Sequence, residues 1–205
     1  MLTAYDEQFY SLTITHLAGV DEAGRGPLAG PVVAAAVILP RSCRIDGLKD
    51  SKLLTEIARE RYYKEIIERA LAWSVGVVTP EAIDSINILQ ASLVAMREAV
   101  LDLSHPFDLV LVDGRFPIPF AEQKICQEAV KRGDGLSAHI AAASVVAKVT
   151  RDRIMRTYHE QYPHYNFARN KGYPTLEHRT ALKLHGPCPI HRRTFSGVRE
   201  LVDEA

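Results

Sequence analysis

The fold is decided by the stretch Leu17-Ala18-Gly19-Val20-Asp21-Glu22-Ala23-Gly24-Arg25-Gly26-Pro27. Its apolar first part predicts a buried strand over residues 17–21, and the glycines and the proline that follow predict a turn. The apolar run from Val32 to Leu39 is bounded by Pro31 and Pro40, and it predicts a second buried strand. The two strands and the short connection between them predict a β-hairpin.

The rest of the chain alternates between helical and extended patterns. Three further strands are expected, over residues 73–78, 107–112 and 123–131. Helical periodicity or helix-start signals occur over residues 55–72, 80–100 and 141–158, and from Thr175 onward. This order predicts an α/β fold with a mixed sheet flanked by helices and a C-terminal helical segment. We expect one domain, with the α/β core in about 16–160 and a helical, basic extension in about 161–205.

Composition excludes several classes of protein. The chain has 205 residues, of which 47% are hydrophobic and 24% charged, as in ordinary globular domains. The longest uncharged run, from Gly26 to Pro40, contains three prolines and falls short of the roughly 20 apolar residues of a spanning helix. Three widely spaced cysteines fit reduced thiols, and the first ten residues lack a secretion signal. A cytoplasmic location with no membrane association is therefore expected.

Charge is distributed unevenly along the chain. The 25 basic and 25 acidic residues cancel overall, but residues 148–199 hold 11 Lys and Arg against 3 Asp and Glu. That segment carries +8 (11 − 3), so the remainder carries −8. The basic segment suggests a surface for polyanions, and the acidic remainder could hold metal ions. A solvated basic face with no partner is the alternative.

Carboxylates follow two apolar strands at the points where those strands end. Asp21 and Glu22 follow residues 17–20, and Asp113 follows residues 109–112. If the two strands are neighbours, the three carboxylates converge, and like charges that close require a cation. Mg²⁺ prefers oxygen ligands, and a pair of such ions can activate water for phosphodiester hydrolysis. The alternative is that Asp113 only begins a turn and Asp21 only caps one.

The glycine loop Gly24-Arg25-Gly26-Pro27-Leu28-Ala29 has two possible interpretations. It matches the permissive dinucleotide fingerprint, but that site needs the loop to open a helix, whereas residues 32–39 predict a strand. The second interpretation is a close approach of the backbone to a ligand, with the Arg25 guanidinium as a planar donor to phosphate. The predicted strand favours the second interpretation.

Several blocks of the chain occur in the same order as the motifs of a known family. The resemblance begins with Gly19-Val20-Asp21-Glu22-Ala23-Gly24-Arg25-Gly26-Pro27 and spans about residues 16–199. The other blocks are Asp50-Ser51-Lys52-Leu53, Val112-Asp113-Gly114, Lys148-Val149-Thr150-Arg151-Asp152, Lys171-Gly172-Tyr173-Pro174-Thr175 and His191-Arg192-Arg193-Thr194-Phe195. Together these blocks resemble the ribonuclease HII family, the type 2 ribonucleases H. The related ribonuclease HIII carries an extra N-terminal domain, which we do not expect here because few residues precede His16.

The resemblance implies a ribonuclease H-like fold and a metal-dependent endonuclease that uses Mg²⁺ or Mn²⁺. Its metal ligands and catalytic residues would be Asp21, Glu22, Asp113 and Asp134. The fourth position departs from the usual K-G-D or K-A-D of the family, because Arg132 stands before Gly133, and Asp152 is another nearby acidic candidate. Ala141 also stands where the family often has serine.

The resemblance further implies a substrate, namely the RNA strand of RNA/DNA hybrids and single ribonucleotides embedded in duplex DNA. Cleavage would leave 5'-phosphate and 3'-hydroxyl ends, and the protein would act as a monomer. A non-catalytic hybrid-binding protein is the alternative. Recognition of the 2'-hydroxyl would fall to Gly24, Arg25 and Gly26, phosphate contacts to Ser51 and Lys52, and sugar packing to Tyr173. Further candidates for phosphate contact are Lys148, Arg151, Lys171, Arg192 and Arg193.

Overall fold

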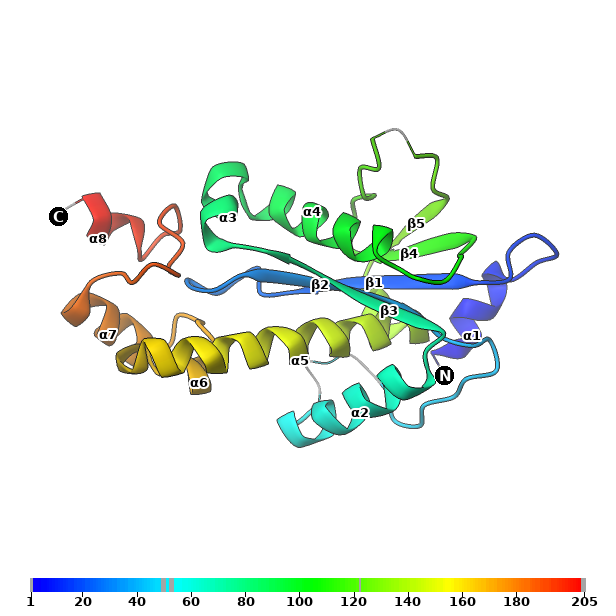
Figure 1. The fold of residues 1–205 in the computed structure, drawn as a ribbon, viewed down its shortest axis with the longest axis horizontal. Coiled ribbons are helices and arrows are strands. Elements are labelled where there is room, and N and C mark those ends of the chain that lie inside the picture. Colours follow the sequence, from blue (N-terminus) through cyan, green and yellow to red (C-terminus); the bar gives the residue numbers. More distant parts are fainter. Residues whose placement is uncertain (1, 49–50, 52–53, 122, 204–205) are drawn as a thin grey trace.

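Figure 1 shows the computed structural model, a five-stranded sheet with helices on both faces. The structure describes residues 2–48, 51, 54–121 and 123–203. The strand order is β3-β2-β1-β4-β5. The strands are β1 (Leu17–Ala23), β2 (Val32–Ile38), β3 (Ala72–Val78), β4 (Leu109–Asp113) and β5 (Gln127–Val130). The mixed α/β fold predicted from the sequence is confirmed.

Strand β1 lies at the centre of the sheet and has a different neighbour on each side. It pairs antiparallel with β2, as the predicted hairpin requires, with Asp21 opposite Ala35. On its other edge it pairs parallel with β4, with Val20 opposite Val112. Asp21 and Asp113 are the next residues along these two parallel strands, so their side chains leave the sheet at the same point.

Two layers of helix cover the sheet. Helices α5 (Ala138–Gln161) and α2 (Glu56–Arg69) lie on one face, and α3 (Pro80–Ile86) and α4 (Ile88–Leu101) lie on the other (Figure 1). Short helices follow at the C-terminal end: η4 (Pro163–Tyr165), α6 (Phe167–Asn170), α7 (Leu176–His185) and α8 (Arg199–Asp203). The remaining short elements are α1 (Thr3–Asp6), η1 (Glu7–Phe9) and η3 (Gly133–Gly135).

The prediction of one continuous helix over residues 80–100 is wrong. The chain breaks at Asn87, whose φ of 66° lies in the left-handed region. The Asn87 side-chain oxygen accepts hydrogen bonds from the backbone N–H groups of Leu89 and Gln90, at 3.0 and 3.1 Å. The asparagine side chain caps a new helix, so α3 and α4 are separate although their apolar spacing runs through the break.

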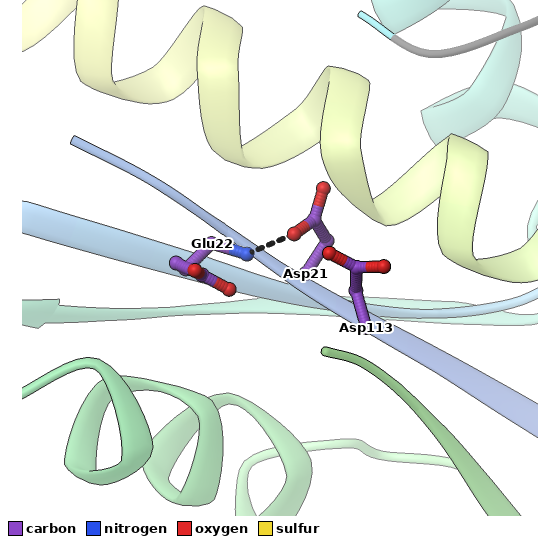
Figure 2. Close-up of side chains that lie close together, drawn as sticks. All are labelled: Asp21, Glu22 and Asp113. Atoms are coloured by element: carbon purple, nitrogen blue, oxygen red, sulfur yellow. Dashed lines mark hydrogen bonds between the residues drawn. The ribbon is translucent and has the colours of Figure 1, made fainter. Parts of the chain in front are cut away.

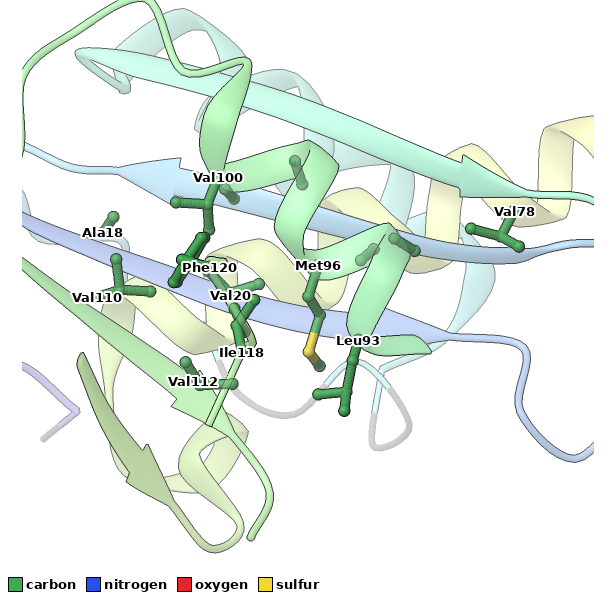
Figure 3. Close-up of a cluster of buried hydrophobic side chains, with 14 of the residues drawn as sticks. Ala18, Val20, Val78, Leu93, Met96, Val100, Val110, Val112, Ile118 and Phe120 are labelled. Atoms are coloured by element: carbon green, nitrogen blue, oxygen red, sulfur yellow. The ribbon is translucent and has the colours of Figure 1, made fainter. Parts of the chain in front are cut away.

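Apolar side chains fill the space between the sheet and α4 (Figure 3). Val20 and Val112 point from the central strands toward Met96 of α4, and all three side chains are buried. On the opposite face the sheet lies unusually close to α5. A Cβ atom at Gly19 would lie 2.1 Å from the carbonyl carbon of His139, so only glycine permits this approach.

The helices of the described chain bear on the question of membrane association. None of them is long and apolar enough to cross a bilayer. Helix α5 is the longest, with 24 residues, but it contains several charged side chains and packs against the sheet.

Candidate active site

Three carboxylates meet where β1 and β4 end (Figure 2). Asp21, Glu22 and Asp113 each place one carboxylate oxygen within 4.8 Å of the others. Asp21 is 3% exposed, and its Oδ1 accepts the backbone N–H of Glu22 at 2.7 Å. Glu22 is still within β1, opposite Ala34 of β2, and its carboxylate reaches the same group although successive side chains of a regular strand point to opposite faces. The convergence inferred from the two strand ends is confirmed.

Asp113 is held in place by a backbone group of η3, the short helix that follows β5. Its Oδ1 accepts the N–H of Gly133 at 2.7 Å, and a Cβ atom at Gly133 would lie 3.4 Å from that same oxygen. The neighbouring Asp134 is buried in η3 and lies outside the group of three carboxylates whose oxygens come within 4.8 Å. The sequence offered no sign of the contact from Gly133 to Asp113. The role of Asp134 as a fourth ligand stays a prediction.

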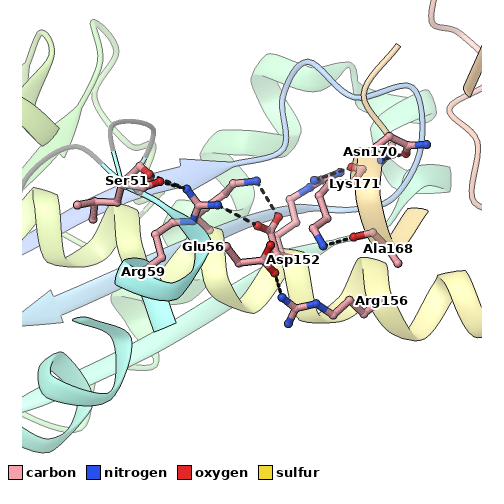
Figure 4. Close-up of polar contacts among 12 residues, drawn as sticks. Ser51, Glu56, Arg59, Asp152, Arg156, Ala168, Asn170 and Lys171 are labelled. Atoms are coloured by element: carbon pink, nitrogen blue, oxygen red, sulfur yellow. Dashed lines mark hydrogen bonds and ion pairs between the residues drawn. The ribbon is translucent and has the colours of Figure 1, made fainter. Parts of the chain in front are cut away.

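Asp152, the other acidic candidate, is part of an ion-pair cluster between α2 and α5 (Figure 4). Its carboxylate accepts a hydrogen bond from the Lys148 ammonium at 2.7 Å and lies 4.0 Å from the guanidinium of Arg59. The side chain of Asp152 is only 5% exposed. These two cations account for the buried charge of Asp152 without a metal ion, which favours Asp134 as the fourth candidate.

The glycine loop passes beside the carboxylates and then enters β2, as the strand prediction required. Gly24 is buried with a φ of +99°, whereas Arg25 and Gly26 are exposed. The Arg25 guanidinium donates to Glu22 Oε1 at 3.1 Å. The open side of Gly26 faces Tyr173, because a Cβ atom there would lie 3.8 Å from Tyr173 Cε1. The structure thus brings the predicted glycine loop and the predicted tyrosine together.

Tyr173 is 41% exposed and held by its backbone. Its carbonyl oxygen accepts the N–H of Thr175 at 2.8 Å, and it lies 2.9 Å from Nδ1 of the buried His178. The Lys148 ammonium lies 5.8 Å from the centre of the tyrosine ring. His178 is a residue that sequence patterns did not single out, because one histidine within a helix carries no distinguishing signal.

The two predicted phosphate contacts near residue 51 have different outcomes. Ser51 is 3% exposed, and its hydroxyl bonds to that of Ser144 in α5 at 2.9 Å. In this arrangement the Ser51 hydroxyl serves the packing of the chain, and its role toward phosphate stays a prediction. Lys52 lies outside the described residues.

Three of the five basic candidates of the C-terminal segment are buried, which corrects the expectation that they contact phosphate. Arg151 and Arg192 are fully buried, and Lys171 is 7% exposed. The Lys171 ammonium donates to the carbonyl oxygen of Ala168, and burial lowers its pKa (Figure 4). Phosphate oxygens in a duplex cannot reach such groups. Lys148 and Arg193 remain candidates.

Comparison with known proteins decides the family. The family model of ribonuclease HII matches residues 18–198. The chain belongs to the ribonuclease HII family. It is 54% identical over 189 residues to the ribonuclease HII of Geobacter sulfurreducens, covering 92% of this chain and 86% of the relative.

Solved structures agree with the family. The crystal structure of ribonuclease H2 from Pyrococcus horikoshii superposes with a TM-score of 0.76 at 30% identity, covering 92% of this chain and 98% of that one. A ribonuclease HIII called Bst-RNase HIII, crystallised in complex with Mn²⁺, matches with a TM-score of 0.72 at 16% identity, over 95% of this chain and 71% of that one. This second likeness concerns the fold alone.

Membership of the ribonuclease HII family makes the chain a metal-dependent endoribonuclease that cleaves RNA in RNA/DNA hybrids. The residues at the strand ends fit such a metal. Asp21, Glu22 and Asp113 offer only carboxylate oxygens, within 4.8 Å of one another, which is the donor set that hard divalent cations prefer.

Proposed function

We propose that the enzyme incises duplex DNA at single embedded ribonucleotides as well as cleaving RNA/DNA hybrids, and that it leaves 5'-phosphate and 3'-hydroxyl ends. The observation that carries this proposal is the position of the glycine loop. It connects β1, which supplies Asp21 and Glu22, to β2, and its exposed Gly26 faces Tyr173. One ribose could therefore be read directly beside the carboxylates.

The carboxylates carry the chemistry in this proposal. Asp21, Glu22 and Asp113 would hold divalent ions, with Asp134 as the fourth ligand. Two bound ions supply the activation of the attacking water and the stabilisation of the leaving oxygen. The Gly133 N–H fixes the orientation of Asp113, so this carboxylate is already aligned before substrate binds. Mg²⁺ and Mn²⁺ both suit this donor set.

Recognition of the ribonucleotide is assigned to the backbone of the glycine loop and to the ring of Tyr173. Gly24, Arg25 and Gly26 would read the 2'-hydroxyl, the group that separates RNA from DNA at one site. Tyr173 would pack on the sugar beyond the junction, and Lys148 beside it would contact a phosphate. Lys52 and Ser51 remain phosphate candidates. A monomeric state and a cytoplasmic location stay predictions.

The proposal is tested with duplex DNA that contains one ribonucleotide, incubated with the enzyme and Mg²⁺. We expect a single nick at the ribonucleotide, at the phosphodiester bond on either its 5' or its 3' side. End labelling of the products identifies the 5'-phosphate and the 3'-hydroxyl. Chelation with EDTA and the variant Asp113→Asn should each abolish the nick. An enzyme that cleaves a continuous hybrid but leaves this duplex intact would contradict the proposal, and so would 3'-phosphate ends.

A further inference from the structure

Two arginines lie beneath the glycine loop and are fully buried. Both guanidinium groups bond to backbone carbonyl oxygens, and no carboxylate is among their hydrogen-bond partners in the described chain. Arg192 uses all five of its N–H donors, toward the carbonyl oxygens of Gly24, Arg25, Pro27, Gly30 and Pro31 at 2.6 to 3.2 Å. Arg151 donates to the carbonyl oxygens of Ala29, Pro31 and Lys171, each at 3.0 Å.

Burying a cation without a carboxylate partner is expensive unless other dipoles replace its water. Eight hydrogen bonds to carbonyl oxygens provide that replacement here. Burial still lowers the pKa of Arg151 to about 10 and that of Arg192 to about 9, so both remain charged at neutral pH. Such a costly arrangement of two adjacent cations calls for a role beyond packing.

The bonds have a directional consequence for the loop. Together with the backbone N–H of Arg192, which donates to the carbonyl oxygen of Leu28 at 2.8 Å, they turn inward the carbonyl oxygens of residues 24, 25 and 27–31. The N–H groups of Arg25 and Gly26 donate to no other group within the described residues, and both residues are exposed. At Arg25 and Gly26 the loop therefore presents N–H donors to solvent, while most of its carbonyl oxygens are bonded in the interior. Donors are what a ribose hydroxyl or a phosphate oxygen can accept from.

One of the two arginines, Arg151, also joins the loop to the segment that holds Tyr173. Arg151 bonds to the carbonyl oxygen of Lys171, and the N–H of Leu28 donates to the carbonyl oxygen of Gly172 at 2.8 Å. Gly24 packs directly on this support, because a Cβ atom there would lie 2.1 Å from Arg151 Nε. The relative position of Gly26 and Tyr173 thus depends on buried groups that substrate never touches.

We propose that Arg151 and Arg192 are positioning residues, which hold the backbone of residues 24–31 in one orientation and thereby set how strongly the enzyme prefers ribose to deoxyribose. This inference rests on the proposed recognition of a single ribonucleotide. It gives the two arginines a role different from the phosphate contacts expected of them.

The test separates binding preference from cleavage. Arg192→Lys keeps the charge but loses the planar fork, so a single ammonium with three donors faces five carbonyl oxygens. In an Asp113→Asn background, affinity is measured for a duplex with one ribonucleotide and for the all-DNA duplex of the same sequence. We expect the ratio of the two affinities to fall about tenfold, because the loop can turn its donors away. In the active background kcat should fall roughly ten- to hundredfold, as for a displacement of about 1 Å.

Two measurements distinguish positioning from a general loss of structure. Affinity for the all-DNA duplex and the concentration of Mn²⁺ required for half-maximal cleavage should remain within about twofold of the parent, because the carboxylates and the exposed cations are unchanged. Arg69→Lys is the matched control, since Arg69 is exposed in α2 and pairs with Glu65 of the same helix at 2.6 Å. It should leave every one of these values unchanged.

Arg151→Lys is the second variant and should also lower the ratio of affinities. If either variant folds and the ratio is unchanged, the proposal is overturned. Failure of both variants to fold would overturn it as well, because the two arginines would then support the fold itself. A parent enzyme that shows no preference for the duplex with one ribonucleotide would instead overturn the proposed function, and this inference with it.

Discussion

The carboxylate edge, formed by Asp21, Glu22 and Asp113, and the C-terminal basic segment of residues 148–199 are both rich in charge, but the charge has a different role in each. At the edge, Asp21, Glu22 and Asp113 converge as their positions after two apolar strands predict. In the segment of residues 148–199, which suggested a surface for polyanions, several of the basic side chains are buried inside the protein. Arg153 pairs with Glu60 at 2.6 Å, and Arg156 pairs with Glu56 and Glu60, both glutamates belonging to α2.

The difference shows which charge patterns can be read from sequence. A carboxylate that ends a buried strand has a defined position, because register places it beside the end of the neighbouring strand. A net charge over fifty residues has no such anchor. It counts Arg151 and Arg192, which bind carbonyl oxygens in the interior, equally with Arg193, which is exposed.

The largest effect is expected at the carboxylate edge. Asp113→Asn preserves size but removes a ligand charge, so cleavage should fall by several orders of magnitude, measured in single-turnover assays with saturating Mg²⁺. The melting temperature without metal should hold or rise, because repulsion from Asp21 and Glu22 is relieved. Activity near that of the parent would remove Asp113 from the metal ligands.

A second comparison, between Asp134 and Asp152, tests which of these aspartates belongs to the carboxylate edge. Asp134→Asn should lose at least about a hundredfold in kcat, whereas Asp152→Asn should retain most activity and lose stability instead. The reason is that Asp152 neutralises Lys148 and Arg59 inside the protein. Cleavage rates at saturating Mg²⁺ and thermal melts of both variants make the comparison. The opposite pattern of activities would exchange the two assignments.

Acid should weaken the C-terminal segment through His191. Burial, and after it the neighbouring His178, lowers the pKa of this histidine to about 4. Its folded-state pKa lies below the ordinary 6.5, so its contribution is complete above pH 6.5 and is lost as pH falls toward 4. The contribution amounts to roughly 3 kcal/mol at most, since each pKa unit is about 1.4 kcal/mol.

Urea unfolding at pH 7 and pH 4.5 measures that loss. His191→Gln should show a smaller change between the two pH values than the parent, and the exposed His185→Gln should behave as the parent. An identical pH dependence in the parent and in His191→Gln would show that protonation of His191 is not what destabilises the segment.

Tyr173 should affect recognition more than chemistry. Tyr173→Ala is expected to lose roughly ten- to hundredfold in cleavage at one embedded ribonucleotide, on the scale of about 1 to 3 kcal/mol for stacking on a nucleic acid. The loss on a continuous hybrid should be smaller, because many registers are available there. Equal losses on both substrates would assign Tyr173 to the support of the fold.

The smallest effect is expected from the exposed charges of the basic segment. Arg193→Glu should reduce the slope of log affinity against log salt by about one for hybrid binding by the inactive enzyme, because one phosphate contact is lost. Arg69→Glu in α2 is the control and should not change the slope. Arg192 is unsuited to this measurement, since its charge is buried. An unchanged slope for Arg193→Glu would place it away from the duplex.

Local patterns determined a large part of this protein. The apolar runs on both sides of the glycine loop specified the hairpin of β1 and β2, and Thr55 and Thr175 marked the starts of α2 and α7 correctly. Each of these features depends on neighbours within a few residues. The break at Asn87 was also local, but the apolar spacing that continues through it masked the signal.

By itself, then, the sequence determined the strands, the carboxylates at their ends and the family, because these reside in short contiguous blocks. Only the tertiary structure decided which charges face substrate. Arg192 lies more than 160 positions from the loop whose carbonyl oxygens it binds, and Asp152 meets Arg59 across two helices. Burial is a property of the whole packed chain. The sequence shows the same basic residue whether its cation is surrounded by water, by a carboxylate or by carbonyl oxygens.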